Sequence, residues 1–187
     1  MHTYPIQIAG LERQLPICKV TDELYIGAFI CFGDAELTVA CARELLKLVP
    51  MEDYDYMFTA EAKSIPLMHE MARQSGAKKY FIARKGPKAY MPDPIHVEDN
   101  SITTAGTQRL FLGQDDAELL RGKRELLMDD VISTGGSLRA MEELVNLAGG
   151  TVTGRVAVLA EGDAAQRTDI RFLAPLPLFN ADGTVKG

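Results

Sequence analysis

Mostly uninterrupted apolar stretches alternate along the chain with segments of helical periodicity. The apolar stretches predicted to be strands are 54–59, 79–84, 125–130 and 151–160. A strand with one face in water alternates apolar and polar residues, whereas a continuous apolar run is typical of a strand buried on both faces. The alternation of such strands with helices predicts an α/β fold in which helices flank a mainly parallel sheet.

Three helices are predicted between these strands. In the first, Leu37, Cys41 and Leu45 recur every fourth residue, as expected for one buried helical face. Each helix is bounded by a residue suited to start it and a residue that breaks it, namely Asp34 and Pro50, Ser64 and Gly76, and Ser137 and Gly149. Pro66 is compatible with the first turn of the second helix.

The pattern changes between residues 86 and 114. Pro87, Pro92 and Pro94 interrupt any regular element there, and the stretch that follows resembles a β-hairpin turning at Ala105-Gly106. Because this segment interrupts the α/β alternation, we predict a flap over one face of the molecule. Insertions of this kind often carry functional residues.

Length and composition indicate one globular domain over residues 1–187. The chain has 187 residues, of which 47% are hydrophobic and 25% charged, and its net charge is −6. That charge argues against a nucleic-acid-binding surface, which is built from clustered Lys and Arg. No run of 18 apolar residues predicts a membrane span, and the first residues lack the pattern of a secretion signal, so we expect a cytoplasmic protein.

The three cysteines predict neither a disulfide framework nor a zinc site. Cys18, Cys31 and Cys41 are an odd number and form no Cys-x-x-Cys pair. Cys31 and Cys41 lie in apolar surroundings, where a thiol usually serves as a small hydrophobic side chain.

The segment 126–137, LLMDDVISTGGS, carries the clearest chemistry. Ligands of an open parallel sheet bind at the carboxyl ends of the strands, and Asp129 and Asp130 stand at such an end. The glycines and hydroxyl groups of the following turn, residues 133–137, suit a phosphate at a helix N-terminus. The two carboxylates would repel that phosphate unless they faced sugar hydroxyls or a metal-bound part of the ligand. A phosphorylated sugar satisfies both halves of the segment.

Two other phosphate motifs are absent. The sequence has neither Gly-x-Gly-x-x-Gly, which binds dinucleotides, nor Gly-x-x-x-x-Gly-Lys-[Ser/Thr], the P-loop. Each half of 126–137 alone is also compatible with an ordinary strand-to-helix turn, so the prediction depends on the joined string.

An apolar strand, two acids, two small or apolar residues and Thr-Gly-Gly-Ser together resemble the signature of the type I phosphoribosyltransferases, which bind 5-phosphoribosyl-1-pyrophosphate (PRPP). The resemblance implies that Asp129 and Asp130 address the ribose 2′ and 3′ hydroxyls. It further implies that the turn holds the 5′-phosphate through Ser133, Thr134, Gly135, Gly136 and Ser137.

Two further segments are similar to elements of the same family. Segment 59–66 resembles the pyrophosphate loop of the adenine branch, with Glu61, Ala62, Lys63 and Ser64 in its acid-small-base-small positions. Segment 84–88 resembles an Arg-Lys-x-x-Lys element whose lysines reach the pyrophosphate, often in the neighbouring subunit. The resemblance therefore implies Mg²⁺ on the pyrophosphate, a homodimer, and PRPP contacts from Arg84, Lys85 and Lys88. Transfer would depend on Asp129, Asp130, Lys63 and Lys88.

The accepted base is less constrained. The hypoxanthine-guanine branch has an aspartate where this chain has Ser133, so the resemblance favours a purine enzyme of the adenine or xanthine branch, with adenine preferred. The flap glutamate of adenine enzymes has no counterpart in 101–104; Glu98 lies nearby, and whether it takes that place stays open. Residues 1–33 and 161–187 are expected to form a hood over the base, with Val131, Tyr25 and Phe29 as stacking candidates. For Tyr25 and Phe29, an ordinary core position is the more common role of such an aromatic residue.

Two other classes of protein remain open. A non-catalytic regulator could use the same site to sense PRPP, although no helix-turn-helix segment or basic stripe accompanies it. A phosphatase or kinase-like protein could use Asp129 with Mg²⁺, but that activity explains neither Lys63 nor the basic flap. A phosphoribosyltransferase for another base, xanthine or orotate, is the nearest alternative to adenine transfer.

Overall fold

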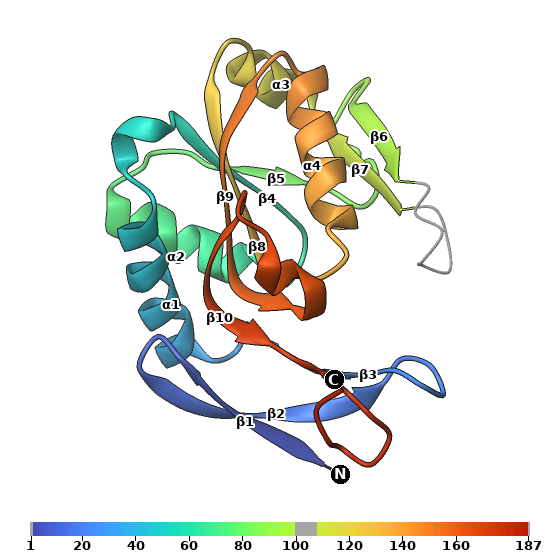
Figure 1. Ribbon diagram of the computed structural model, residues 1–187. Coiled ribbons are helices and arrows are strands. Elements are labelled where there is room, and N and C mark those ends of the chain that lie inside the picture. The colour runs from blue at the N-terminus through green and yellow to red at the C-terminus, as the bar shows by residue number, and fades with distance from the viewer. Residues whose placement is uncertain (1, 100–107, 187) are drawn as a thin grey trace.

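A five-stranded sheet forms the centre of the computed structural model, which describes residues 2–99 and 108–186 (Figure 1). Its strands are β10 (Arg171–Leu176), β9 (Thr151–Glu161), β8 (Arg124–Ile132), β4 (Tyr56–Ala60) and β5 (Phe81–Ala83), in that order. Every neighbouring pair is parallel, which confirms the predicted parallel sheet. The four predicted strands are present, with bounds that shift by at most two residues.

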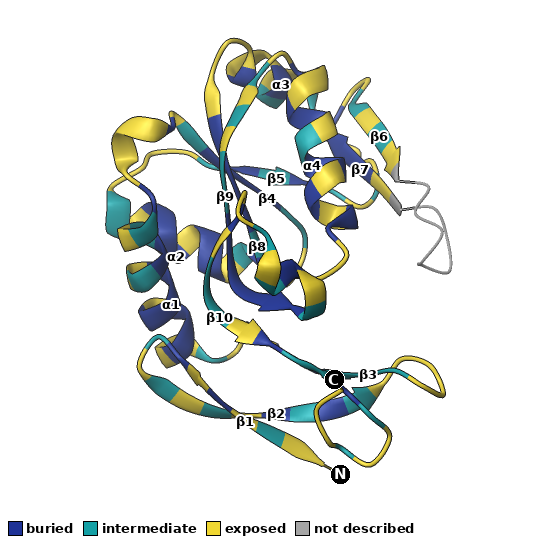
Figure 2. Ribbon diagram, in the orientation of Figure 1, coloured by how far each residue is buried: buried dark blue, intermediate teal, exposed yellow. Residues whose placement is uncertain are grey.

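Helices cover both faces of this sheet. Helices α1 (Ala35–Leu48) and α2 (Ile65–Ser75) pack on one face, and α3 (Gln114–Leu120) and α4 (Gly136–Leu147) pack on the other. Their inward sides are buried and their outward sides exposed (Figure 2). The Asp34 carboxylate caps α1, as predicted, by accepting the Leu37 N–H at 3.0 Å. None of the helices in the described residues is long and apolar enough for a membrane span.

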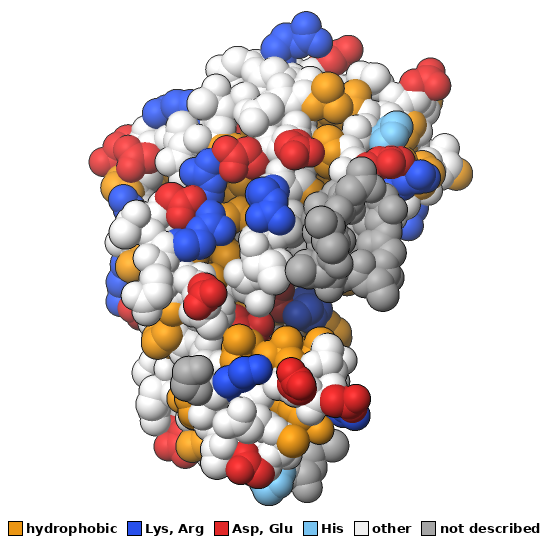
Figure 3. All heavy atoms as spheres, turned by 45° about the vertical axis from the view of Figure 1, so that its right-hand side comes forward, with side chains coloured by type: hydrophobic (Ala, Val, Ile, Leu, Met, Phe, Trp, Pro, Cys, Tyr) orange, Lys and Arg blue, Asp and Glu red, His pale blue; other side chains and the backbone are white. Residues whose placement is uncertain are grey.

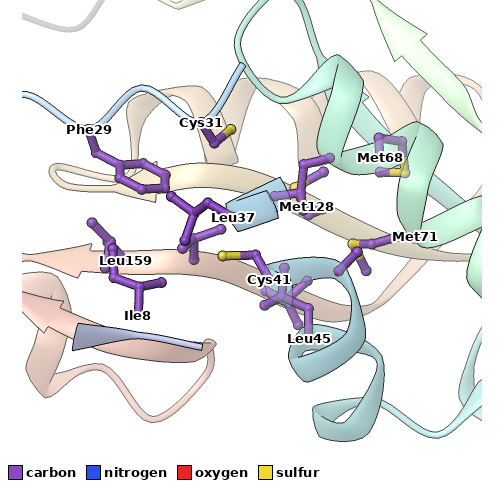
Figure 4. Packing of buried hydrophobic residues seen from close by; sticks show 14 of the residues in the cluster. Ile8, Phe29, Cys31, Leu37, Cys41, Leu45, Met68, Met71, Met128 and Leu159 are labelled. Atoms are coloured by element: carbon purple, nitrogen blue, oxygen red, sulfur yellow. The ribbon is translucent and has the colours of Figure 1, made fainter. Parts of the chain in front are cut away.

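The core between the sheet and α1 contains the two buried cysteines. Cys31 and Cys41 are fully buried among Phe29, Leu37 and Met128 (Figure 4). Both thiols are free, and burial raises their pKa, to about 11 for Cys31 and about 12 for Cys41. Their predicted role as small hydrophobic side chains is confirmed.

A second, antiparallel sheet joins the two ends of the chain. It contains β1 (Thr3–Ile8), β2 (Leu11–Lys19), β3 (Tyr25–Gly27) and β11 (Leu178–Phe179). Ile6, Ile8 and Leu15 alternate with exposed residues along β1 and β2 and bury their side chains in the α1 core. Strand β10, although it lies within residues 161–187, belongs to the central sheet.

The flap segment contains the predicted antiparallel hairpin. Strand β6 (Ile95–Asp99) pairs with β7 (Gln108–Leu112) and lies beside α4. Backbone hydrogen bonds of 2.8 Å between Arg84 and Phe111 attach β7 to the segment that leaves β5. The predicted turn at Ala105-Gly106, together with 101–104, lies outside the described residues.

Candidate active site

Two adjacent carboxylates occupy the carboxyl end of β8. Both side chains reach the same group, because the Ser64 hydroxyl lies 3.2 Å from Asp129 Oδ1 and 3.5 Å from Asp130 Oδ1. The Asp129 Oδ1 atom accepts the Ser64 hydroxyl at 3.2 Å and the Asp130 backbone N–H at 2.9 Å. The Asp130 side chain is only 6% exposed. The pair is therefore held in place by the end of the neighbouring strand β4 and its loop.

The loop after β4 supplies a cation to this pair. The Lys63 Nζ atom lies 2.7 Å from Asp130 Oδ2, and its side chain remains 47% exposed. Ser64 at the start of α2 also accepts the Asp130 N–H through its hydroxyl, at 3.1 Å. The structure thus brings together Lys63, Ser64, Asp129 and Asp130, all four of which were predicted to share a site.

Burial changes the protonation of the pair. Removal from water, followed by the charge of neighbouring Asp130, raises the pKa of Asp129. Protonation of Asp129 would relieve its repulsion with the neighbouring Asp130 carboxylate. A protonated Asp129 can donate a hydrogen bond as well as accept one.

The turn between β8 and α4 leaves its backbone groups available. Gly135 has φ of 80°, a left-handed conformation that glycine adopts without strain, and it precedes the first residue of α4. No side chain of the described residues caps this helix N-terminus. Ser133, Thr134 and Ser137 are exposed around a small hollow of about 90 Å³. Free amides and exposed hydroxyls are the groups that bind an anion at a helix N-terminus.

A larger cavity of about 260 Å³ connects these features. Its wall includes Lys63 and Ser64 from the β4 loop, Asp129 from β8, Ser137 from the turn, and Lys85 from beyond β5. Figure 3 shows acidic and basic side chains inside a notch on one face of the molecule. The cavity therefore offers cations, carboxylates and hydroxyls to one ligand.

The basic segment contributes unequally. Arg84 is turned toward the Glu61 carboxylate, at 2.8 Å, and toward the Tyr90 hydroxyl, at 2.6 Å. Burial opposes ionisation of Glu61, but the Lys85 N–H and the charges of Arg84 and Lys88 outweigh it, so the pKa of Glu61 is lowered. Lys85 lines the cavity, whereas Arg84 supports its loop through Glu61 and Lys88 stands outside the cavity lining.

The three predicted base contacts lie in different surroundings. Val131 is half-buried and lines the cavity. Phe29 is 3% exposed and packs in the α1 core, which favours a packing role, and Tyr25 is half-buried on β3.

Three charged residues near the site were not predicted from the sequence. Glu161, at the carboxyl end of β9, is 7% exposed; burial raises its pKa, and the Ser133 hydroxyl and Lys63 partly offset that effect. Arg139, on the first turn of α4, donates to the Thr134 carbonyl at 3.3 Å. Arg167 lies against Gly135. Only Arg139 is near the turn in sequence. Glu161 and Arg167 could be identified as neighbours of the turn only from the three-dimensional structure.

The cavity has oxygen ligands for a metal but no cluster dedicated to one. Among residues 2–99 and 108–186, no three His, Cys, Asp or Glu side chains converge. Asp129 and Asp130 supply carboxylate oxygens, the ligand type that Mg²⁺ prefers when substrate phosphates complete its coordination. This donor set fits a magnesium ion carried mainly by its ligand.

Sequence comparison identifies relatives that match most of the chain, although no family model matches it. An adenine phosphoribosyltransferase of Corynebacterium diphtheriae is 32% identical over 177 residues, which span 95% of this chain and 93% of the relative. A hypoxanthine/guanine phosphoribosyltransferase of Methanotorris igneus is 30% identical over 148 residues, spanning 77% and 76%.

Solved structures share the fold. The adenine phosphoribosyltransferase of Rhodothermus marinus superposes with a TM-score of 0.64 at 21% identity, over 93% of this chain and 94% of that one. The parallel sheet, the antiparallel second sheet and the relatives of nearly equal length agree with one assignment. This chain belongs to the type I phosphoribosyltransferase family, in its adenine branch.

Proposed function

We propose that this protein transfers the phosphoribosyl group of PRPP to adenine with release of pyrophosphate, as a step of purine salvage. The observation that carries the proposal is the meeting of Lys63, Ser64, Asp129 and Asp130 in one cavity, next to an uncapped glycine turn. A sugar diol, a phosphate and a pyrophosphate are the groups that this set of donors and acceptors fits together.

In this mechanism the chain's residues position the ligand and balance its charge. The Asp129 and Asp130 carboxylates accept hydrogen bonds from the ribose 2′ and 3′ hydroxyls. The amides and hydroxyls of 133–137 hold the 5′-phosphate, and Ala62, Lys63 and Ser64 hold the pyrophosphate. As the bond between C1′ and pyrophosphate breaks, Lys63 and Lys85 stabilise the charge that develops on the leaving oxygens.

Lys63 links ligand binding to the carboxylate pair. In this structure its ammonium group neutralises Asp130 at 2.7 Å. A pyrophosphate carries more negative charge than Asp130 and competes with it for Lys63. The ribose diol then takes the place of Lys63 as the partner of Asp130. Asp129 or Asp130 would help to hold a Mg²⁺ ion carried on the pyrophosphate, and this ion would supply further neutralisation of the leaving group. Lys88 and Arg84 would complete the charge balance from the basic segment.

Adenine is preferred among the bases. Ser133 stands where an aspartate of the hypoxanthine-guanine branch handles the purine proton, and the full-length relative is named for adenine. Transfer to hypoxanthine or guanine is the second candidate, supported by the M. igneus relative. Xanthine and orotate remain alternatives to be measured in the same assay.

The decisive assay is pyrophosphate release from PRPP and Mg²⁺ with a panel of adenine, hypoxanthine, guanine, xanthine, orotate and uracil. We expect the highest kcat/KM with adenine. Calorimetry with PRPP and Mg²⁺ should show binding without any base. Binding without turnover of any base would instead identify a PRPP sensor, and the absence of both would contradict the proposal.

The assembly and setting of the enzyme belong to the same proposal. We propose one domain over 1–187, in which the terminal segments 1–33 and 161–187 form a hood over the base and 86–114 forms a flap. The protein is proposed to act in the cytoplasm as a homodimer, with Lys88 reaching the partner's site. Light scattering during size-exclusion chromatography tests the dimer directly.

A further inference from the structure

The guanidinium group of Arg167 lies directly against the glycine turn. A Cβ atom built on Gly135 would stand 2.8 Å from Arg167 Nη1 and 3.7 Å from Arg139 Nη1. Arg167 follows the short helix η2 (Gly162–Gln166), which continues from the end of β9. A segment about thirty residues further along the chain therefore places a cation directly against the glycine of the turn.

A bidentate ion pair fixes this cation. Arg167 Nε donates to Asp169 Oδ1 at 2.9 Å, and Arg167 Nη2 donates to Asp169 Oδ2 at 2.7 Å. The fork uses one edge of the guanidinium and leaves Nη1 outside the pair, on the side of Gly135. The Arg167 side chain is 31% exposed, so part of it remains open to solvent beside the turn.

The charge around the turn explains the need for such a cation. A phosphate monoester carries nearly two negative charges, while Asp129 and Asp130 lie a few residues before the turn. The helix N-terminus alone supplies only about half a positive charge. An arginine fixed beside the amides supplies a full charge and directional N–H donors.

We propose that Arg167 binds the phosphate monoester at the turn through Nη1, and that Asp169 is the positioning residue that holds the guanidinium in place. This inference deepens the proposed function, because it assigns the 5′-phosphate a charged contact from the segment after β9. If it is correct, the site prefers a phosphorylated ligand over the same ligand without phosphate, and the difference in affinity is larger than the turn amides alone would give.

The test compares ligands that differ only in the phosphate. Affinities of the whole protein for AMP, adenosine and ribose 5-phosphate are measured by calorimetry, for the wild type, Arg167→Gln and Asp169→Asn. Arg167→Gln is expected to weaken the binding of AMP and of ribose 5-phosphate by about tenfold or more. Its affinity for adenosine should stay within about twofold of the wild type. Asp169→Asn is expected to weaken the phosphorylated ligands less, by about threefold, because the arginine remains but is less well fixed.

Arg124→Gln is the matched control. Arg124 also forms a fork with an aspartate, Asp55, but at the opposite end of β8. This variant should bind all three ligands like the wild type. Unchanged AMP and ribose 5-phosphate affinities in Arg167→Gln, or an equal loss for adenosine, would overturn the inference, as would a wild type that binds neither phosphorylated ligand. These measurements need no turnover, so they are decided even where the base panel detects no pyrophosphate.

Discussion

Strand β8 buries acidic side chains at both ends, but their surroundings differ. At the carboxyl end, Asp129 accepts the Ser64 hydroxyl. Asp130 Oδ2 forms no hydrogen bond among the described residues, but it lies 2.7 Å from the Lys63 ammonium group. Near the amino end, both oxygens of the Glu125 carboxyl group are buried without a hydrogen-bond partner among the described residues. Burial raises the pKa of the Asp129 carboxyl group at one end. At the other end it raises the pKa of the Glu125 carboxyl group to about 8. A buried acid alone does not mark a site; converging donors and a cation do.

The largest expected effect is at the carboxyl end. Asp130→Asn removes the charge that pairs with Lys63 and weakens one contact to the ribose diol. A charged hydrogen bond of about 1.5–3 kcal/mol predicts a loss of roughly 10–10²-fold in kcat/KM for PRPP. Steady-state kinetics and calorimetry with PRPP measure it. A variant within about threefold of the wild type would show that the pair is as inessential as Glu125.

The next effect sharpens the comparison from the other end. Glu125 has a folded-state pKa of about 8, well above 4.5, its ordinary value. Between these values the folded protein binds more protons than the unfolded chain, so the free energy of unfolding falls as pH rises and levels off above pH 8. We expect Glu125 to account for a loss on the order of 5 kcal/mol across this range.

Glu125→Leu and Glu125→Gln should both abolish that part of the pH dependence, which urea unfolding from pH 5 to pH 9 measures. Glu125→Leu should also stabilise the protein at pH 8 and leave pyrophosphate release unchanged, because Glu125 touches no proposed substrate group. A variant with the slope of the wild type would contradict the assignment of the slope to Glu125. A loss of activity would remove the distinction between the two ends.

A smaller effect concerns the turn. Gly135→Ala places a Cβ 2.8 Å from Arg167 Nη1 at φ of 80°. The strain should cost about 1–2 kcal/mol of stability, and displacement of Arg167 should weaken ribose 5-phosphate binding about tenfold. Gly76→Ala is the control, because Gly76 has φ of 76° with no atom within 4 Å of the added Cβ. Gly76→Ala should lose stability but keep its affinity for ribose 5-phosphate. If it lost affinity as well, the loss in Gly135→Ala would be due to destabilisation and not to displacement of Arg167.

These contrasts also explain what the sequence could predict. The carboxylate pair and the turn lie within twelve consecutive residues, and Lys63 follows the adjacent strand, so strand-end rules brought them together. Glu161 and Arg167 reach the site only through the pairing of β9 with β8. Helix α3 was missed because its seven residues bury only Ala117 and Leu120, too short a pattern to show periodicity.

The smallest predicted effect distinguishes two lysines that follow β5, at the same edge of the sheet as the carboxylate pair. Lys85 lines the cavity, while Lys88 is half-buried outside its lining and acts on Glu61. Lys88→Ala should therefore leave the calorimetric affinity for PRPP nearly unchanged and reduce kcat about tenfold, since its charge is needed mainly as pyrophosphate departs. Lys79→Ala, which removes an ion pair with Asp116, should change neither quantity, because neither residue lines the cavity. If Lys88→Ala instead weakened PRPP binding as strongly as Asp130→Asn, Lys88 would serve ground-state binding as well as charge stabilisation. The proposed division of roles between Lys85 and Lys88 would then be wrong.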